Sequence, residues 1–267
     1  MAELGLAIAF VEGRGGPVEL ARLKRLLTGE PGSGAAVATL LDGQRPDGGW
    51  PAFWAPHASS LDATCFRLAQ AEQVGVGPED PAVARAAAFM AERQRPDGSW
   101  EEDVRAVGAT VPPWLQPGDE AAVLYLTGNC GFWLAVLGGP RAEAVRAASY
   151  LGARVGDDGQ LGRSFLHTYW LAGGLWWRLG QVQPAELVFA YLCRRLGADF
   201  PASNLGWLVN SLCIAGVPSS HPLVDAAASL LELCQQGDGR WASEDGPDYD
   251  VHSTLEAMRA LRLCGRW

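Results

Sequence analysis

The sequence predicts an all-α fold, a single α/α barrel of about twelve helices that forms one domain over residues 1–267. Three observations predict it. A turn phrase recurs along the chain, apolar residues repeat with the period of a helix, and two kinds of helix alternate. No segment shows the period-2 alternation of a half-buried strand, so we expect strands to be nearly absent. The length alone suits one large domain or two small ones, and it is ample for a sizeable core.

The recurring phrase reads Gln-Arg-Pro-Asp-Gly-Gly-Trp at 44–50 and Gln-Arg-Pro-Asp-Gly-Ser-Trp at 94–100. A third copy lies at 235–241, and a degenerate fourth lies at 156–161. Repetition on this scale is typical of stacked supersecondary units. In each copy Asp-Gly favours a tight turn, with glycine supplying a positive φ, and the tryptophan packs back on the helix ends.

Apolar periodicity predicts helices over residues 2–12, 17–28, 33–44, 59–74, 80–94, 119–137, 140–153, 164–180, 184–196, 203–216, 221–236 and 250–265. Five of these are rich in small residues and tryptophan, which predicts an inner ring that is buried all round. The intervening helices carry one apolar stripe and a charged face, as an outer ring would. The Pro- and acid-rich segment 101–118 is long enough to be a functional loop over one mouth.

Composition excludes several classes of protein. With 21 basic and 30 acidic side chains, the net charge of −9 argues against a nucleic-acid partner, which would need a basic stripe. No apolar run reaches the length of a membrane span, and the N-terminus lacks the basic region of a signal peptide. Six cysteines without a C-x-x-C pair indicate reduced thiols in a cytoplasmic protein. The eleven tryptophans raise the question of what they line.

At its turn phrases the chain resembles the Q-x-x-D-G-x-W repeats of the prenyltransferase and squalene/oxidosqualene cyclase superfamily. Because the length leaves room for one barrel, it is most similar to the single-domain class II terpene cyclases. The resemblance implies an enzyme that protonates an isoprenoid alkene or epoxide and cyclises the polyene through carbocations. It implies a lipophilic isoprenoid or prenylated aromatic substrate, which allows peripheral membrane association, and it implies no metal or organic cofactor. The Asp-x-Asp-Asp motif of many such enzymes is absent.

Class II chemistry needs a carboxylic acid that stays protonated, and an apolar cavity raises the pKa of such a group. The first candidate is Asp119, which opens a small-residue helix above an apolar face. The resemblance implies an acid on this helix, and the alternative interpretation is a helix N-cap. Asp62 is the second candidate. Its Asp-Ala-Thr context resembles the end of the Asp-rich motif, and a capping box is the alternative there.

The N-terminal ends of the inner helices of a barrel share one mouth, where polar and aromatic residues would form a mixed pocket. His167 is expected there, where it would either hydrogen-bond the acid or take the last proton; the alternative interpretation is a buried core histidine. Aromatic faces stabilise carbocations in such a pocket. The candidates for substrate binding are Trp50, Trp54, His57, Asp62, Phe132, Trp133, Tyr169, Trp170, Trp207 and His252.

Two alternative hypotheses for the function remain. The β subunits of protein prenyltransferases share the repeat and bind zinc through an Asp, a Cys two positions later and a distant His. Asp250-Val-His252 resembles only the histidine part, and no Asp-x-Cys exists in the chain, so no metal site is expected. The second alternative is a non-catalytic barrel that binds a lipid or another protein.

Overall fold

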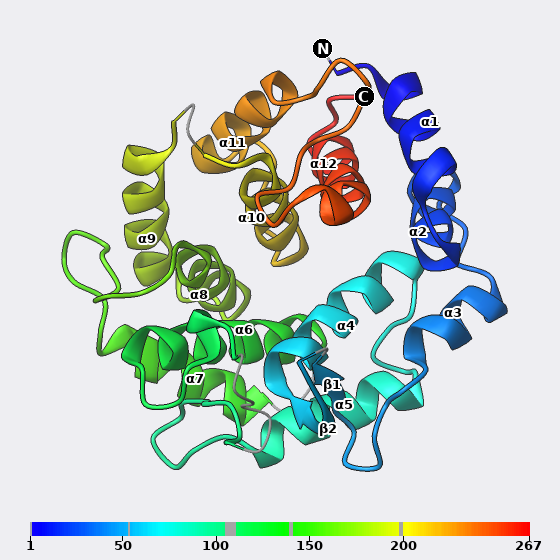
Figure 1. Ribbon diagram of the computed structural model, residues 1–267. Coiled ribbons are helices and arrows are strands. Elements are labelled where there is room, and N and C mark those ends of the chain that lie inside the picture. Colours follow the sequence, from blue (N-terminus) through cyan, green and yellow to red (C-terminus); the bar gives the residue numbers. More distant parts are fainter. Residues whose placement is uncertain (1, 53, 105–110, 139–140, 198–199) are drawn as a thin grey trace. The chain divides into compact units, whose positions relative to one another are not determined.

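The computed structural model describes residues 2–52, 54–104, 111–138, 141–197 and 200–267, and Figure 1 shows it to be almost entirely helical. Within these ranges there are twelve α-helices, two short strands and two 3₁₀ helices. In chain order they are α1 (Leu4–Arg14), α2 (Pro17–Thr28), α3 (Gly34–Leu41), β1 (Trp50–Ala52), β2 (Ala55–Ser60), α4 (Leu61–Val74), α5 (Pro81–Glu92), η1 (Pro113–Leu115), α6 (Glu120–Val136), α7 (Arg141–Gly152), α8 (Leu166–Arg178), α9 (Val182–Arg195), α10 (Ala202–Ile214), α11 (Pro222–Leu233), η2 (Pro247–Tyr249) and α12 (Asp250–Leu263). The all-α prediction is confirmed.

Within the described residues the one sheet is the antiparallel pair β1–β2, which begins at the tryptophan of the first turn phrase. The prediction of helix from residue 59 was wrong by two residues, because Ser59 and Ser60 pair with the other strand. Of the loop expected at 101–118, residues 105–110 lie outside the described part of the chain, and η1 occupies its second half. Among the described residues, no helix is long and apolar enough to cross a membrane.

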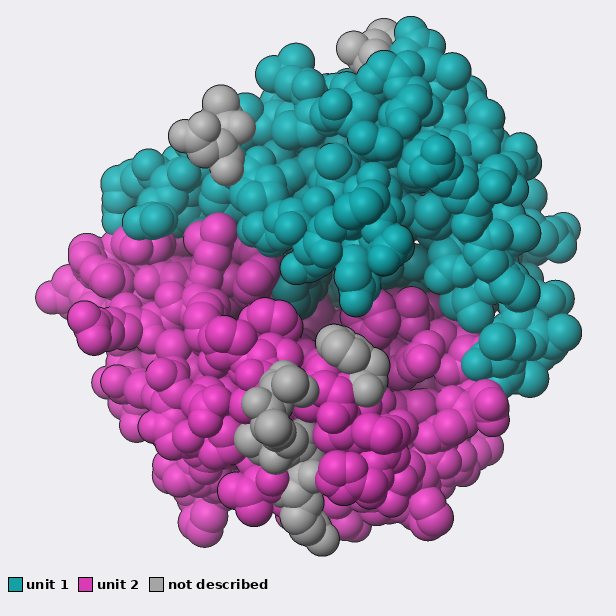
Figure 2. Space-filling view, viewed as in Figure 1, with its two compact units in different colours: residues 1–39, 73–75, 192–267 teal, residues 40–72, 76–191 magenta. Residues whose placement is uncertain are grey.

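The chain divides into two compact units, coloured separately in Figure 2. Unit 1 comprises residues 1–39, 73–75 and 192–267, and unit 2 comprises residues 40–72 and 76–191. Unit 1 therefore contains α1, α2 and α10–α12, whereas unit 2 contains the β-hairpin, α5–α8 and most of α4. The single domain expected from the sequence stays a prediction.

Both units contain the two predicted kinds of helix. In unit 2, every residue of α6 from 122 to 134 and of α8 from 168 to 176 is buried, whereas α5 and α7 bury one stripe. In unit 1, α10 packs on α11 and α12, and α12 also packs on α1 and α2. Small residues allow these contacts. A Cβ at Gly131 in α6 would lie 2.8 Å from the Ala147 side chain and 2.9 Å from Leu175.

Each turn phrase ties an outer helix to an inner one. In the copy at 94–100, Gln94 Nε2 donates to Gly98 O at 2.9 Å and to Glu143 O, in the first turn of α7, at 2.8 Å. The Trp100 backbone N–H donates to Thr127 Oγ1 on α6 at 3.0 Å. The first and third copies make the same bonds, with Ala82 and Thr64 in one and Glu3 and Thr254 in the other. The repeat thus fixes the register of three inner helices.

Candidate active site

The first turn of α4 carries Asp62, which is half-buried. Ser60 Oγ accepts from Ala63 N at 3.1 Å, so Ser60 caps the helix and Asp62 is left outside the cap. The carboxylate of Asp62 accepts a hydrogen bond of 2.7 Å from Tyr125 Oη, near the middle of the first half of α6. The Trp114 side chain, in η1, also hydrogen-bonds this carboxylate.

Tyr125 is itself oriented by α6. Asn129, one turn later, donates from Nδ2 to Tyr125 Oη at 3.3 Å, and both side chains are buried. Burial, and then the charge of Asp62, raise the pKa of Tyr125 well above its usual value, so the phenol stays a donor. The bonds therefore run in one direction, from Asn129 to Tyr125 to Asp62. Among the described residues, the buried Asn129 Oδ1 has no hydrogen-bond partner.

The environment of Asp62 combines two opposing effects. Burial raises the pKa of the Asp62 carboxyl, and the bonds from Tyr125 and Trp114 lower it by less, so the net shift is upward. The group therefore keeps its proton to a higher pH than an ordinary aspartic acid. The two donors are nevertheless in place for the carboxylate that remains after the proton leaves.

A second carboxyl lies against the start of α4. Glu102, two residues after the tryptophan of the second turn phrase, is only 3% exposed. Its Oε2 accepts from Leu61 N at 2.9 Å, and its Oε1 accepts from the Ser60 hydroxyl. Burial raises the pKa of Glu102 to about 7, and the charge of Asp62 contributes to the rise.

Aromatic rings from α8 surround Tyr125 on another side. The Tyr125 ring meets Phe165 edge-on at 6.5 Å and His167 at 6.2 Å between centroids. The His167 ring lies 5.0 Å from Trp170, again edge-on. Phe165 and His167 are half-buried at the beginning of the helix, whereas Trp170 is fully buried. Unit 2 therefore gathers the half-buried acid Asp62, its hydrogen-bond donors and four aromatic rings near the beginnings of α4, α6 and α8.

Several predicted residues belong to this group and others do not. The structure brings together Asp62, His167 and Trp170. Asp119 is exposed, and its side chain accepts from Ala122 N at 3.1 Å, which is the N-cap of the alternative interpretation. A capping carboxylate turns back to its own backbone, so the structure shows the cap, and the assignment of Asp119 as the acid stays a prediction.

The remaining aromatic candidates occupy varied places. Trp50 and Phe132 are almost fully buried, and Trp133 packs edge-on against Phe132 at 5.5 Å. Tyr169 stacks on Tyr191 at 4.7 Å. His57 is exposed in β2 and Trp54 is half-buried beside it, while Trp207 and His252 belong to unit 1. Their contact with substrate stays a prediction.

Sequence reasoning missed Tyr125, Trp114, Asn129 and Glu102. Tyr125 and Asn129 sit four residues apart on a helix that is apolar all round, so no amphipathic face singles them out. Glu102 has a neighbour, Glu101, that pairs with Arg95 on the surface, and the sequence does not distinguish the two. The exposed Trp114 lies in the loop segment for which no periodicity exists.

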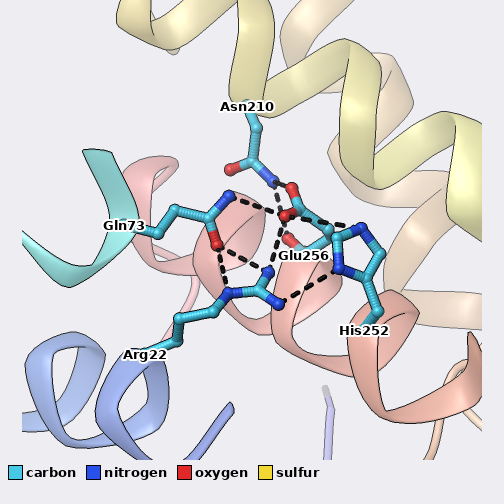
Figure 3. A network of polar contacts seen from close by, with 5 residues as sticks. All are labelled: Arg22, Gln73, Asn210, His252 and Glu256. Atoms are coloured by element: carbon cyan, nitrogen blue, oxygen red, sulfur yellow. Dashed lines mark hydrogen bonds and ion pairs between the residues drawn. The ribbon is translucent and has the colours of Figure 1, made fainter. Parts of the chain in front are cut away.

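Unit 1 contains a separate polar network, shown in Figure 3. The buried Glu256 carboxylate accepts from Arg22 Nη2 at 2.8 Å, from Gln73 Nε2 at 2.6 Å and from Asn210 Nδ2 at 2.6 Å. Arg22 Nη1 donates to His252 Nδ1 at 3.1 Å, which requires that nitrogen to be unprotonated. Burial and then the charge of Arg22 lower the pKa of His252 to about 4. These bonds join α2, the end of α4, α10 and α12.

The fold defined by these elements is that of the type II terpene cyclases. A variant of the type II terpene cyclase MstE from Scytonema, in complex with its substrate geranylgeranyl dihydroxybenzoate, matches with a TM-score of 0.61 at 14% identity, over 94% of this chain and 87% of that one. The apo form of MstE matches with a TM-score of 0.59 at 16% identity, over 96% and 86%. A protein from Actinoplanes matches with a TM-score of 0.59 at 19% identity, over 93% and 90%. No family model matches the chain, and no curated protein matches its sequence.

Proposed function

We propose that the chain is a class II terpene cyclase in which Asp62 donates the initiating proton. The observation that carries the proposal is the carboxyl of Asp62, whose pKa burial raises while Tyr125 donates to it. A neutral carboxylic acid beside aromatic rings is what protonation of an alkene or epoxide requires. Asp119 is exposed, and its side chain accepts from Ala122 N of its own helix.

Each bond broken and formed in the reaction can be assigned to these residues and the substrate. The O–H bond of Asp62 breaks as a C–H bond forms on the isoprenoid alkene, or as an epoxide oxygen takes the proton, and a carbocation results. Tyr125 and Trp114 hold the carboxylate left behind, and their bonds strengthen as its charge develops. Ring closures then move the cation along the polyene, where the faces of Phe165 and Trp170 would stabilise it by roughly 0.5–2 kcal/mol each.

The last step removes a proton from the final cation, and we assign it to His167 or to a water beside it. We take the substrate to be an isoprenoid or prenylated aromatic compound, because MstE holds geranylgeranyl dihydroxybenzoate on the same fold. A substrate this lipophilic would be drawn from a membrane surface, so the proposal includes peripheral membrane association. The chemistry uses no metal or organic cofactor.

The test compares two isosteric variants, Asp62→Asn and Asp119→Asn, with geranylgeranyl dihydroxybenzoate as the first substrate. Asn keeps the acceptor for Tyr125 at position 62 and remains a good N-cap at position 119. We expect Asp62→Asn to lower kcat by about 10²–10⁴-fold, the range for a general acid, and Asp119→Asn to retain it. The reverse result would assign the acid to Asp119. Tight binding without cyclic product in wild-type protein, across prenyl chain lengths, would favour the non-catalytic lipid-binding alternative.

A further inference from the structure

The two cysteines at the ends of α10 and α12 have no part in the proposed reaction. Cys213 lies in the last turn of α10, and Cys264 directly follows α12. Both thiols are free and half-buried, and both belong to unit 1. They are therefore partly open to small reagents in solution, unlike the fully buried thiols of Cys65 and Cys130.

The packing of the two helices brings these cysteines side by side. A Cβ at Gly206 on α10 would lie 3.4 Å from Ala257 N on α12, so the helix backbones approach closely there. Cys213 and Cys264 each follow one of these residues by seven positions, almost two turns, and so return to the same helix face. The side chains of Cys213 and Cys264 are hydrogen-bonded to each other. The equal spacing on both helices is that of two helices running in the same direction.

The two thiols differ in their reactivity. Cys213 donates the hydrogen bond, and this bond, together with the nearby charge of Arg266, lowers the pKa of Cys264 by more than burial raises it. The same bond, and then burial, raise the pKa of Cys213. The thiolate is the nucleophile in thiol–disulfide exchange. Cys264 is therefore the attacking group, and Cys213 stays a thiol until a mixed disulfide has formed.

We propose that Cys213 and Cys264 are a modification site, at which a low-molecular-weight disulfide such as oxidised glutathione converts the two thiols into a reversible disulfide. The Cys264 thiolate attacks one sulfur of the reagent, and a mixed disulfide forms as the first glutathione thiolate leaves. Cys213 then loses its proton, attacks Sγ of Cys264 and releases the second glutathione. Two protein thiols are oxidised, one reagent disulfide is reduced to two thiols, and reduced glutathione reverses both steps. The bond would join α10 to the helix that carries His252 and Glu256.

Cys65 and Cys130 provide a comparison within the same chain. Their sulfur atoms, on α4 and α6, are 3.9 Å apart, so these two thiols are also adjacent. Both residues are at most 1% exposed, and burial raises the pKa of Cys65 well above its usual value. Because oxidation requires exposure and thiolate character, this pair should stay reduced.

The test equilibrates native protein with mixtures of reduced and oxidised glutathione, and then maps the disulfides by alkylation, proteolysis and mass spectrometry. We expect wild-type protein to lose the thiols of Cys213 and Cys264 together, to show the tryptic peptide 263–266 linked to the peptide of Cys213, and to regain both thiols in excess reduced glutathione. Cys65 and Cys130 should stay reduced in the same sample. The proposal is overturned if Cys264 stays a thiol in the most oxidising mixture, bonds to another cysteine or remains a mixed disulfide. Equal oxidation of Cys65 and Cys130, or a bond that reduced glutathione does not break, also overturns it.

Two variants assign the roles of the thiols. Cys213→Ser removes the second thiol of the exchange, so glutathione should accumulate on Cys264 as a stable mixed disulfide. The matched control Cys234→Ser removes another half-buried thiol of unit 1, directly after α11, and should keep the bond. Loss of the bond in Cys234→Ser, or a Cys213→Ser protein without glutathione on Cys264, contradicts the assignment. If Cys213→Ser fails to fold, the disulfide map of the wild type decides the proposal alone.

Discussion

Replacing Tyr125 with Phe removes the hydroxyl between Asn129 and Asp62 and changes little else, because the ring stays in its buried place on α6. The lost bond, 2.7 Å long, is made to a carboxylate in the ionised state. Hydrogen bonds to charged groups contribute about 1.5–3 kcal/mol. At 1.36 kcal/mol per pH unit, the pKa of Asp62 should rise by roughly 1–2 units if the whole difference falls on the ionised form.

The sign distinguishes this effect from a general loss of structure. Tyr125 favours the carboxylate, so without it Asp62 keeps its proton to higher pH, and the alkaline limb of kcat moves upward. The plateau of kcat falls, because the developing carboxylate is less stabilised in the transition state; an equal loss there corresponds to about 10–150-fold.

The assay is cyclisation of geranylgeranyl dihydroxybenzoate from about pH 5 to pH 9, with thermal unfolding as the control for folding. Tyr150→Phe is the matched variant, since Tyr150 lies on α7 with its ring 3.5 Å from the Arg154 guanidinium and is not one of the site candidates. We expect its pH profile to match that of the wild type. An alkaline limb that is unmoved in Tyr125→Phe, or that moves downward, would refute the role given to the hydroxyl.

Three further predictions concern stability. The pKa of Glu102 is raised from 4.5 to about 7 in the folded state, so its contribution to stability is complete below pH 4.5 and is lost as the pH rises through 7. The free energy of unfolding of the wild type, taken relative to that of Glu102→Gln, should therefore fall by about 3 kcal/mol between pH 4.5 and pH 8 in urea unfolding. Gly131→Ala should lower the free energy of unfolding by about 1–3 kcal/mol, because its methyl group would press on Ala147 and Leu175. The control Gly13→Ala on α1, which has open space around it, should be neutral or stabilising. Equal losses in urea unfolding would contradict the packing argument. Arg22→Met should cost about 3–5 kcal/mol, because it leaves Glu256 charged and buried. Adding Glu256→Met removes that charge and should recover part of the loss, since Gln73 and Asn210 then lose an acceptor. A double variant no more stable than the single one in thermal unfolding would show that the pair itself, and not the unpaired charge, carries the effect.

The sequence predicted the helices well because each apolar stripe and each turn phrase is a local signal. The predicted range 17–28 coincides with α2, and 250–265 differs from α12 only at its end. The acid was predicted less well, since an aspartate that opens a helix has the same local sequence whether it caps the helix or faces a cavity. Asp119 and Asp62 differ in what surrounds them: Ser60 takes over the cap of α4, which leaves the Asp62 carboxylate for Tyr125. That difference depends on contacts 63 residues apart in the chain.

The repeat nevertheless indicates positions of the candidate site, once the hydrogen bonds of its turns are known. Thr64, Thr127 and Thr254 each receive the backbone N–H of a turn tryptophan. A residue two positions earlier on a helix points about 200° away from such a threonine, and therefore away from the turn.

Asp62, Tyr125 and His252 occupy these three positions. Two of them meet in a hydrogen bond, and the third accepts one from Arg22. The turn phrases thus do more than connect helices. By fixing the register of each inner helix, they determine which residue is directed away from the outer layer, and the chain places an ionisable side chain there each time.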